Sequence, residues 1–585
     1  MNESARKNQA LLSGNEAIAR GAYEAGVRVG TAYPGTPSTE ILENLRNYPG
    51  VSVEWSVNEK VALEVASGAS FSGARAIVTM KHVGLNVAAD PLMTLAYTGV
   101  GGGMVIVTAD DPGMHSSQNE QDNRFFARFA GIPMFEPCDS EEARRLTREA
   151  FNLSERFDTP VLLRVTTRIS HSKGIVELQE PETRPALERV PLSPPKYVML
   201  PSFARQRAAI KLERLAGLRR ETEKWVLGEK GTGDGKTGVI TSGVCYQYVR
   251  EIAPDFDILR LVMTHPFPDE SVNRFAENHE KVFVIEELDT YLTDQVRALG
   301  IEVEDLGSSW KLGELDPDRV ARMLGKPVCE ISASEGPPPA PPVMCPGCPH
   351  RSTFAVLKEL GVEVTGDIGC YTLGALPPLS AMHTCVNMGG GVSHAFGIEK
   401  AHGPSASETT VAVIGDSTFL HSGITSLLDI VYNGGSTTTI ILDNSTTAMT
   451  GRQHHPGTGF RLDGTPAPAV DLEALCRALG VKDAHTIGAY NLDLVRRTIK
   501  EALVRREPSV IIVKTSCVLV ERGRRTPYRI DLDLCTDCGN CMELGCPAIR
   551  EGDNGKYIDP ILCVGCDLCR QVCELGAIQV VEEKS

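Results

Sequence analysis

Short runs of apolar, mostly β-branched residues recur along the chain, and each is followed by a turn and then by apolar positions at helical spacing. Because these runs are apolar almost throughout, they are typical of strands that are buried on both faces of a parallel sheet. Their alternation with helical segments predicts an α/β protein built from several doubly wound units. The clearest predicted strands are residues 76–80, 104–108, 161–165, 238–242, 282–286, 410–415, 438–442 and 510–514.

Two stretches of the chain have the composition of linkers. Residues 228–238 contain five glycines with charged residues between them, and residues 332–342 are crowded with proline. Residues 205–225 are basic and helix-favouring, which indicates a solvated connector helix. Near Gly523 the α/β pattern gives way to a tail that is dense in cysteine. The predicted segments are a first domain at 1–195, a connector at 196–235, and further domains at 236–332, 343–522 and 525–585.

The composition is that of an ordinary soluble globular protein, with 42% apolar and 23% charged residues. At roughly 100–200 residues per domain, the 585 residues are enough for about three to five domains. The net charge of −16 argues against binding to nucleic acid or to an anionic membrane. The first residues contain no apolar signal core and no run of about 18 apolar residues occurs, so we expect a cytoplasmic protein.

Cysteine is concentrated in the tail. The chain has 17 cysteines, and eight of them lie between Cys535 and Cys573. Because a reducing compartment does not favour disulfides, this clustering indicates metal ligation. The two runs are Cys535-x2-Cys538-x2-Cys541-x4-Cys546-Pro547 and Cys563-x2-Cys566-x2-Cys569-x3-Cys573.

The spacing of both runs matches the bacterial two-cluster ferredoxin pattern, in which the fourth cysteine of each run binds the other cluster. We therefore predict a C-terminal ferredoxin domain with two [4Fe-4S] clusters. Structural zinc is the alternative, but zinc has no use for the third closely spaced cysteine of each run. Gly545 exceeds the usual spacing of the first run by one residue and must bulge. The predicted ligands are Cys535, Cys538, Cys541 and Cys573 for one cluster, and Cys546, Cys563, Cys566 and Cys569 for the other.

A second motif follows the predicted strand at 410–414. Gly415-Asp416-Ser417 stands at the end of this strand, and Asn444 comes 28 residues after Asp416, beyond the next strand. Carboxyl ends of parallel strands meet at one edge of a sheet, where such sheets bind their ligands. Mg²⁺ prefers oxygen ligands and commonly bridges a protein to a diphosphate. The spacing matches the thiamine diphosphate motif, with Ser417 in place of the usual glycine. It predicts Mg²⁺ ligands in the side chains of Asp416 and Asn444 and in the carbonyl of Thr446.

Two further segments resemble elements of ferredoxin-linked 2-oxoacid oxidoreductases. Met449-Thr450-Gly451 resembles their MTG element, and Tyr33-Pro34-Gly35-Thr36-Pro37-Ser38 resembles the loop of their pyrimidine-binding domain. The resemblance implies that Thr36 and Met449 contact thiamine diphosphate. It also implies that Glu59 is the catalytic carboxylate that faces the aminopyrimidine ring. Without the resemblance, Glu59 reads as an ordinary charge in the first turn of a helix.

The order of these segments resembles the α subunits of the indolepyruvate:ferredoxin oxidoreductase family over essentially the whole chain. Met344-Cys345-Pro346-Gly347-Cys348-Pro349-His350-Arg351 and Gly366-Asp367-Ile368-Gly369-Cys370-Tyr371 are part of this resemblance. It implies a pyrimidine-binding domain at 1–195, a transketolase C-terminal-like domain at 236–332 and a diphosphate-binding domain at 343–522. It also places Gly369, Cys370, Gly415 and Ser417 beside the cofactor.

The same resemblance implies an activity and its partners. Indolepyruvate, phenylpyruvate or hydroxyphenylpyruvate is expected to be oxidatively decarboxylated with coenzyme A, with electrons passing through the clusters to ferredoxin. Relatives complete their site with a small second subunit, so we expect a separate β subunit in an (αβ)2 assembly. Two alternatives are a non-oxidative thiamine decarboxylase or synthase, which has no need for eight clustered cysteines, and an electron-transfer subunit that is not catalytic.

Several residues keep two interpretations. We interpret Cys345 and Cys348 as part of a structural loop, because no second pair accompanies them at ligand spacing; a zinc or redox site is the alternative. His454 and His455 either reach the substrate side or lie on the surface. His82 either borders the pocket or is a core histidine with satisfied hydrogen bonds.

Two more features bear on substrate and partner binding. Where the pyruvate branch has an arginine for the substrate carboxylate, this chain continues Asp110-Asp111-Pro112, so the anchor is expected elsewhere. A basic stretch leads into the tail and is either a docking patch for ferredoxin or a solvated linker. It consists of Arg522, Arg524, Arg525 and Arg529.

Overall fold

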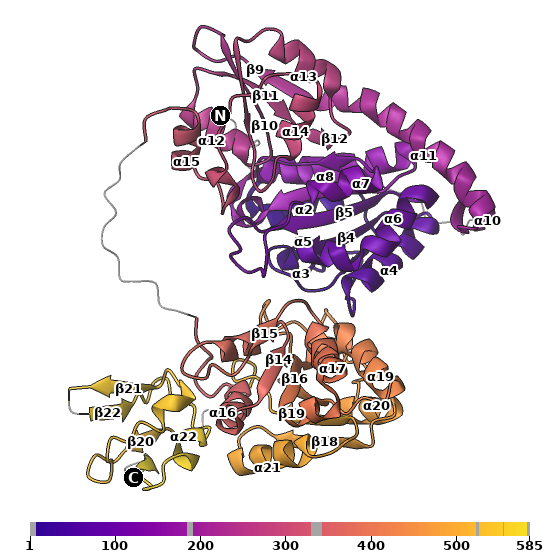
Figure 1. The fold of residues 1–585 in the computed structure, drawn as a ribbon. Helices are drawn as coiled ribbons and strands as arrows, with labels where there is room; N and C mark the ends of the chain where they lie inside the picture. Colours follow the sequence, from indigo (N-terminus) through magenta and orange to yellow (C-terminus); the bar gives the residue numbers. More distant parts are fainter. Residues whose placement is uncertain (1–7, 184–190, 329–341, 522–525, 554, 582–585) are drawn as a thin grey trace. The chain divides into compact units, whose positions relative to one another are not determined.

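The computed structural model describes residues 8–183, 191–328, 342–521, 526–553 and 555–581 (Figure 1). The chain divides into two compact units, Met1–Ser334 and Glu335–Ser585. All eight strands predicted from the apolar runs are present, and each lies in a sheet whose neighbouring strands are mainly parallel. The prediction of an α/β protein with parallel sheets is confirmed. None of the helices in the described part of the chain combines the length and the apolar character needed to cross a membrane.

The first unit begins with a seven-stranded sheet of strand order β12-β6-β7-β5-β4-β2-β3. Its strands are β2 (Val29–Ala32), β3 (Ser52–Trp55), β4 (Ala76–Lys81), β5 (Met104–Asp110), β6 (Met134–Phe135), β7 (Val161–Thr166) and β12 (Met263–His265). Neighbouring strands are parallel except for β12, which pairs antiparallel with β6. Strand β12 comes from the segment predicted as the next domain, so that segment completes the edge of this sheet.

Helices cover both faces of the seven-stranded sheet, because alternate strand residues point to opposite sides. Ile77 and Val105 pack in a core with α2 and α8, whereas Val78 and Ile106 pack in a second core with α4 and α6. Ser13 begins α2 with a capping box in which its hydroxyl accepts from the N–H of Glu16. The helices are α2 (Gly14–Glu24), α3 (Thr39–Leu45), α4 (Glu59–Phe71), α5 (His82–Val87), α6 (Ala89–Thr98), α7 (Arg124–Ala130), α8 (Ser140–Phe157) and α9 (Thr167–His171), and an antiparallel ribbon joins β1 (Gln9–Ser13) to β8 (Lys173–Glu177).

A second, four-stranded sheet follows in the same unit, with strand order β13-β10-β11-β9. Its strands are β9 (Val226–Glu229), β10 (Thr237–Ser242), β11 (Asp257–Leu261) and β13 (Lys281–Ile285), and its helices are α12 (Cys245–Ile252), α13 (Asp269–Ala276), α14 (Tyr291–Ala298) and α15 (Pro317–Met323), with a 3₁₀ turn η2 (Ser309–Lys311). The prediction of a linker at 228–238 is wrong for its first residues, because β9 pairs with β11 and Gly228 lies opposite Leu259. A Cβ added to Gly231 would stand 2.5 Å from the carbonyl oxygens of Asp255 and Phe256, so glycine here allows close backbone packing.

The predicted connector helix is α11 (Pro201–Thr222), preceded by α10 (Pro194–Tyr197) and followed by a 3₁₀ turn η1 (Glu223–Trp225). It is not a solvated helix on all sides. Arg207 is buried and donates to the carbonyls of Tyr97 and Thr98 at 2.9 and 2.8 Å. Arg207 and Arg214 both pair with Asp158. The basic residues that suggested a solvated face therefore fasten the helix to the end of α6 and to the cap of α8.

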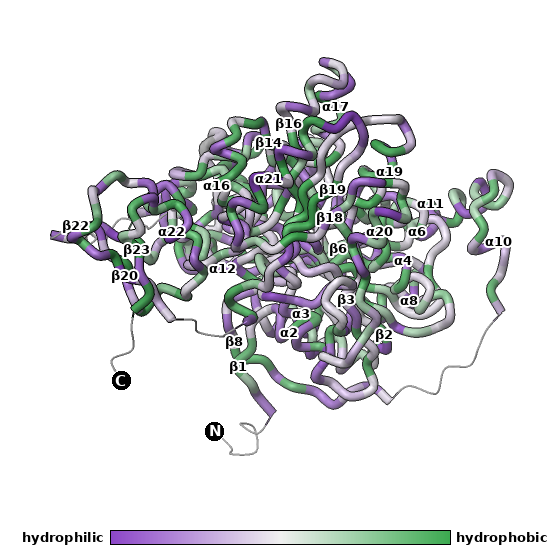
Figure 2. Tube along the Cα trace, turned by 90° about the horizontal axis from the view of Figure 1, so that it is seen from below, coloured by the Kyte–Doolittle hydropathy of each residue, from purple (hydrophilic) through white to green (hydrophobic). Residues whose placement is uncertain are grey.

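The second unit contains a six-stranded parallel sheet of order β15-β14-β16-β17-β19-β18. Its strands are β14 (Glu363–Gly366), β15 (Thr384–Cys385), β16 (Thr410–Gly415), β17 (Thr438–Asp443), β18 (Asp483–Gly488) and β19 (Ser509–Lys514). Val413 packs in a core with α16 and α21, and Ile414 packs in a core with α17, α19 and α20. The strongly apolar β19 lies between these layers (Figure 2). The helical elements are α16 (His350–Leu360), η3 (Cys370–Ala375), α17 (Gly390–His402), η4 (Pro404–Glu408), α18 (Asp416–Thr418), η5 (Phe419–Gly423), α19 (Ile424–Tyr432), α20 (Leu472–Ala478) and α21 (Leu492–Leu503).

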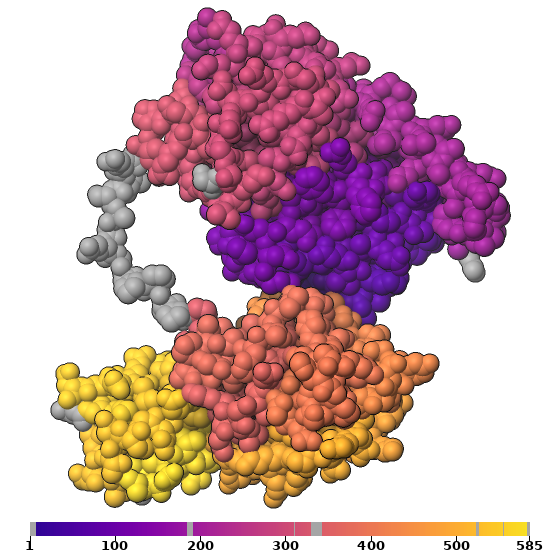
Figure 3. All heavy atoms as spheres, viewed as in Figure 1, coloured from indigo at the N-terminus to yellow at the C-terminus, as the bar shows by residue number. Residues whose placement is uncertain are grey.

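The cysteine-rich tail packs against the domain of the six-stranded sheet (Figure 3). It has two antiparallel pairs, β20 (Tyr528–Ile530) with β23 (Ile578–Val580) and β21 (Ile549–Gly552) with β22 (Gly555–Ile558), and two short helices, η6 (Met542–Leu544) and α22 (Leu568–Gln571). Its own apolar core is small and includes Ala548, Ile549, Ile558 and Ile578. Gln571 of α22 joins the tail to α21, because its side chain accepts from the N–H of Leu492 at 2.9 Å.

Candidate functional site

The predicted Mg²⁺ ligands lie at the carboxyl edge of the six-stranded sheet. Strands β16 and β17 are neighbours, with Gly415 opposite Leu442. Asp416 begins the short helix after β16, and Asn444 follows β17; both side chains are buried. The N–H of Ser445 donates to Asp416 Oδ2 at 2.9 Å, which ties the two loops together. The structure thus brings the predicted side-chain ligands of both strands to one place.

The loop after β17 is held by its own side chains. Ser445 has a left-handed backbone with φ of 57°, and the N–H of Thr446 donates to Asn444 Oδ1 at 3.3 Å. The Nδ2 of Asn444 lies 3.3 Å from Nε2 of His350. Burial lowers the pKa of His350 to about 4, so its imidazole is neutral near pH 7 and can accept this hydrogen bond. The amide nitrogen of Asn444 therefore faces His350, and its amide oxygen faces the backbone of the loop at Thr446.

His455 is a buried neighbour of Asp416. Its Nε2 lies 3.2 Å from Asp416 Oδ2, and its exposed fraction is 8%. Burial raises the pKa of Asp416, and the imidazole of His455 opposes that rise. Of the two interpretations of this histidine, the surface one is wrong. His454 is only partly buried, and its Nδ1 lies 3.2 Å from the hydroxyl of Thr458.

Ser417 and Met449 complete the predicted contacts on this side. Ser417 is buried, and its hydroxyl accepts from that of Thr447 at 2.9 Å. This bond joins the turn after β16 to the loop after β17. Met449 is 52% exposed. Its side chain is therefore open to contact by a ligand or a partner.

Asp367 and Tyr371 form a wall that sequence reasoning missed. Asp367 is fully buried and accepts the N–H groups of Gly389 and Gly391 at 3.0 and 3.1 Å. Burial raises its pKa to about 6, while these hydrogen bonds oppose the rise. The ring of Tyr371 lies against Gly369 and Gly415, and a Cβ added to Gly415 would stand 2.7 Å from it. The sequence signal that could have indicated this wall is the pair of glycines, Gly366 and Gly369, close to the aromatic Tyr371.

Four cysteines outside the tail come close together in this unit. Burial raises the pKa of Cys370 to about 11, and the nearby thiols of Cys517 and Cys345 add to the rise. Burial likewise raises the pKa of Cys348 to about 12, with Cys345 and Cys370 contributing. The interpretation of Cys345 and Cys348 as part of a structural loop stays a prediction.

The tail contains two cavities, and each is lined by four cysteines. The first is lined by Cys535, Cys538, Cys541 and Cys573, and the second by Cys546, Cys563, Cys566 and Cys569. These are the two predicted ligand sets. The 16 cysteines of the described residues are free thiols, and no three His, Cys, Asp or Glu side chains of those residues are placed to bind a single metal ion. The second cavity is also lined by Pro346, Gly347 and Arg351.

The extra residue of the first cysteine run has a definite place. Gly545 ends η6 with φ of 62°, a conformation that favours glycine. A Cβ added to it would stand 2.7 Å from Pro378 of the neighbouring domain. The bulge predicted from the spacing is thus a tight turn against that domain.

Glu59 and Thr36 lie in the first unit, whereas the other predicted site residues lie in the second. Glu59 is buried and begins α4, whose N-cap Asn58 accepts from the N–H of Val61 at 2.9 Å. A Cβ added to Gly84 would stand 2.7 Å from Glu59 Oε1, so this glycine makes room for the carboxylate. The carbonyl of Thr36 accepts from the hydroxyl of Ser116 at 3.3 Å.

The strand end where the pyruvate branch has an arginine is occupied by internal contacts. Asp110 Oδ2 accepts from Arg164 Nε at 2.9 Å. Asp111 accepts from the hydroxyls of Ser117 and Thr167, each at 2.7 Å. Nearby, His82 is fully buried, with Nε2 at 3.1 Å from Asn119 Oδ1. Its buried Nδ1 has no hydrogen-bond partner among the described residues, so the expected core histidine with satisfied hydrogen bonds is met only in part.

The N-terminal residues 20–209 match a family model described as pyruvate flavodoxin/ferredoxin oxidoreductase, thiamine diP-bdg. Residues 367–513 match a second, described as thiamine pyrophosphate enzyme, C-terminal TPP binding domain. This second match spans Asp367, Asp416 and Asn444. Both comparisons support thiamine diphosphate as the cofactor.

The chain also resembles whole proteins. Indolepyruvate oxidoreductase subunit IorA of Methanothermobacter marburgensis is 41% identical over 99% of this chain and 98% of its own length. The IorA subunit of Archaeoglobus fulgidus is 40% identical over 98% of each chain. A solved 2-oxoglutarate:ferredoxin oxidoreductase from Magnetococcus marinus, with 2-oxoglutarate, coenzyme A and succinyl-CoA bound, is 17% identical over 54% of this chain and 65% of its own, with a TM-score of 0.45. The full-length matches at about 40% identity show that this chain belongs to the indolepyruvate oxidoreductase IorA family of oxidoreductases, which confirms the resemblance found in its motifs.

Proposed function

We propose that the chain is the catalytic subunit for oxidative decarboxylation of aryl 2-oxoacids with coenzyme A. Its substrates are indolepyruvate, phenylpyruvate and hydroxyphenylpyruvate, and its products are the aryl-acetyl-CoA and CO2. Two electrons and one proton leave with each turnover, and two oxidised ferredoxins each take one electron. The single observation that carries the proposal is that one compact unit holds both the Asp416–Asn444 edge and two four-cysteine cavities.

The residues at the sheet edge fit a magnesium diphosphate. Asp416 and Asn444 would provide side-chain oxygens and Thr446 its backbone carbonyl, which are the hard oxygen donors that Mg²⁺ prefers. His455 fixes the orientation of the Asp416 carboxylate from behind, as the outer partners of metal ligands commonly do. The buried ring of Tyr371 packs against Gly415, the residue before Asp416, and leaves no room for a side chain there. This donor set supports the assignment of Mg²⁺ and the diphosphate to this edge.

The remaining residues have roles in positioning and proton handling. When bound, thiamine diphosphate supplies the nucleophilic carbon and takes up the electrons left by departing CO2. Glu59 would hydrogen-bond the aminopyrimidine ring and hold the proton that the ring exchanges. Gly369, Cys370 and Met449 would border the reacting end of the cofactor. Thr36 would contact the ring near Glu59.

The two cavities of the tail would each hold a [4Fe-4S] cluster. A cubane passes one electron at a time, so two clusters suit a reaction that releases two electrons. A small β subunit in an (αβ)2 assembly and ferredoxin are the proposed partners, in the cytoplasm. Of the basic stretch before the tail, Arg529 is exposed on β20. Arg522, Arg524 and Arg525 lie outside the described residues.

Co-expression with the small subunit and anaerobic purification test the proposal. We expect about eight irons per chain, as two [4Fe-4S] clusters require. Coenzyme A-dependent viologen reduction should be fastest with aryl 2-oxoacids in a panel of 2-oxoacids. Release of free aldehyde without coenzyme A or an electron acceptor would instead support the non-oxidative alternative.

Glu59→Gln tests the catalytic role directly. Turnover should fall at least 100-fold, since general acid–base catalysis contributes about 10²–10⁴-fold. Glu64→Gln is a matched control, because Glu64 lies exposed on the same helix. Unchanged turnover in Glu59→Gln would support the alternative of an electron-transfer subunit that is not catalytic.

A further inference from the structure

Arg351 is a buried arginine in the first turn of α16, directly after the Cys345–Cys348 loop. Its side chain is 2% exposed. Its Nη1 donates to the carbonyl of Leu544 at 2.5 Å, and Leu544 belongs to the tail. Its Nη2 donates to the carbonyls of Met344 and Cys345 at 2.9 and 3.1 Å. The side chain therefore joins the loop before α16 to the cysteine-rich tail.

The positive charge of Arg351 has no counter-charge within the described residues. It takes part in no ion pair there, and its buried Nε has no hydrogen-bond partner. Arg124 and Arg144, which are equally buried, each contact carboxylates, Asp122 at 2.6 Å and Glu24 at 2.5 Å respectively. A buried charge without a partner is costly, and proteins normally pair it or place it at a metal centre. The charge of Arg351 is therefore open to an anion.

An anionic group is expected beside Arg351. It lines the second tail cavity together with its four cysteines, Cys546, Cys563, Cys566 and Cys569. Cysteines bind iron as thiolates, and a cluster with four thiolates is an anion.

We propose that Arg351 is the counter-charge of the [4Fe-4S] cluster held by Cys546, Cys563, Cys566 and Cys569, and that it sets the reduction potential of this cluster. The inference rests on the proposed function, which assigns a cluster to this cavity. A cluster gains one negative charge on reduction, and a fixed positive charge stabilises the reduced form more than the oxidised form. Arg351 is thus a positioning residue that makes this cluster easier to reduce.

The two cavities differ in this respect. The first is lined by Lys556, whose ammonium pairs with Asp537, so its charge is already compensated. The first cavity is lined by tail residues alone and includes the exposed Cys538. The second is lined by residues of the neighbouring domain, including Gly347. The Arg351 cluster is therefore the inner one, next to the domain that carries Asp416, and the cluster at Cys538 is the outer one.

The contact that holds Arg351 in place is tight. Gly347 has φ of 68°, and a Cβ added to it would stand 2.1 Å from Val564 of the tail. The carbonyl of Gly347 accepts from the hydroxyl of Tyr490 at 2.7 Å. Because the Cys345–Cys348 loop is fixed against the tail in this way, and Arg351 donates to carbonyls on both, its distance from the cluster should change little between redox states.

The test is a redox titration of the anaerobic holoenzyme, followed by electron paramagnetic resonance of both clusters. Arg351→Gln removes the charge, and Arg351→Lys keeps it. Lys358→Gln is the matched control, because Lys358 also lies on α16 and pairs with Glu543 of the tail at 2.6 Å, but it is partly exposed and does not line the cavity. We expect one midpoint to become more negative in Arg351→Gln, a smaller shift in Arg351→Lys and none in Lys358→Gln.

The iron content of each variant distinguishes the remaining outcomes of this test. Loss of about half of the iron in Arg351→Gln, with the signal of the other cluster intact, would also support the counter-charge. Full iron with both midpoints unchanged would overturn it. Loss of both clusters together with proteolysis of the tail would overturn it as well, because Arg351 would then hold the tail rather than one cluster. A wild-type enzyme without iron would contradict the proposed function itself, whatever the variants show.

Discussion

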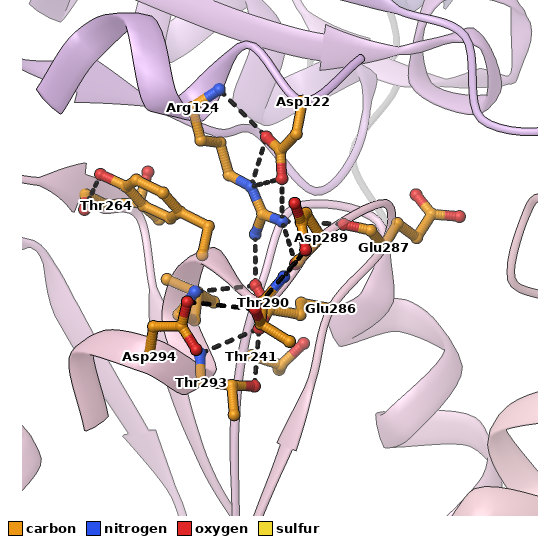
Figure 4. Close-up of polar contacts among 12 residues, drawn as sticks. Asp122, Arg124, Thr241, Thr264, Glu286, Glu287, Asp289, Thr290, Thr293 and Asp294 are labelled. Carbon is orange, nitrogen blue, oxygen red and sulfur yellow. Dashed lines mark hydrogen bonds and ion pairs between the residues drawn. The ribbon is translucent and has the colours of Figure 1, made fainter. Parts of the chain in front are cut away.

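Two buried arginines, one in each unit of the chain, are compensated in different ways. In the first unit, Arg124 lies between Asp122 and Glu286, at 2.6 and 2.8 Å, and also donates to the carbonyls of Glu287 and Asp289 (Figure 4). In the second unit, the carboxylate of Asp416 faces an imidazole, and the guanidinium of Arg351 faces only carbonyls. A buried charge that is compensated within the chain becomes costly only when its partner is removed, whereas the uncompensated charge of Arg351 is open to a charged ligand.

The network around Arg124 also joins two sheets. Arg124 lies on α7 beside the seven-stranded sheet, and Glu286 follows β13 of the four-stranded sheet. Arg164 of β7 repeats the pattern, with Asp110 at 2.9 Å and Glu136 at 2.6 Å. Removal of one partner would leave the others buried and unpaired, which is the costly case for an interior ion pair. The first unit should therefore be the part of the chain where a single charge deletion is most damaging to stability.

Arg124→Met should have the largest effect on stability. We expect the first unit to lose about 3–5 kcal/mol, because Asp122 and Glu286 keep their charges without a partner. The three tryptophans, Trp55, Trp225 and Trp310, all belong to this unit, so urea unfolding followed by tryptophan fluorescence measures it selectively. The exposed Arg128 of the same helix gives the control Arg128→Met, which should change little. Equal unfolding midpoints for the two variants would contradict the comparison.

Asp416→Asn should act on cofactor binding instead of folding. Loss of a metal-ligand carboxylate should weaken the binding of Mg²⁺ and thiamine diphosphate by more than about 100-fold, and His455→Gln by about 10–100-fold, as for partners behind a ligand. Titration calorimetry measures both affinities, and circular dichroism verifies the fold. Asp429→Asn, at an exposed position on α19, is the control. An affinity in Asp416→Asn equal to that of the wild type would show that Mg²⁺ does not bind at this edge of the sheet.

A buried carboxyl beside this network, that of Glu287, should also make the first unit sensitive to pH. Burial raises the pKa of Glu287 to about 7, whereas the unfolded chain ionises near the ordinary value of 4.5. Between these values the folded state holds a proton that the unfolded state has released. Stability is therefore highest below pH 4.5 for this group and falls as the pH rises towards 7, by about 1.4 kcal/mol per pH unit.

Glu287→Gln tests this pH dependence. The slope of unfolding free energy against pH between 5 and 7 should become flatter than in the wild type, and Glu277→Gln, at an exposed site, should leave it unchanged. Tryptophan fluorescence again reports the unit. Parallel slopes for wild type and Glu287→Gln would show that Glu287 is ionised in the folded protein at these pH values.

The smallest effect is expected at the exposed contact between α16 and the tail. Lys358 pairs with Glu543 at 2.6 Å, but both side chains are accessible to solvent. Lys358→Met should change the stability of the tail by no more than about 1 kcal/mol, and less at high salt. The visible absorbance of the clusters during unfolding measures it. A loss as large as that of Arg124→Met would show that exposure is a poor guide to the strength of these pairs.

Sequence reasoning succeeded where the signal is local. The eight central strands were predicted because each is apolar on both faces over five or six residues. Asp416 and Asn444 were predicted because each directly follows a recognisable strand. Strand β9 was missed because its glycine content suggested a linker, although its backbone pairs with a strand about 30 residues later. Strand β12 is three residues long and joins a sheet that belongs mainly to an earlier part of the chain.

The missed site residues share one physical reason. Asp367 acts by accepting from Gly389 and Gly391, which lie more than 20 residues away along the chain. Arg351 meets the tail across 193 residues. Their composition and local spacing are those of ordinary core or helix residues, so only the folded chain distinguishes them.

Strand β12 has a practical consequence for anyone who divides this protein. Met263 and His265 supply the hydrogen bonds that close the sheet beside Phe135 and Met134. A fragment of residues 1–195 would keep β6 but lose the strand that covers it. The backbone donors and acceptors freed in this way would be open to a strand from another molecule. Such a fragment should self-associate, and a soluble truncation should extend past residue 265.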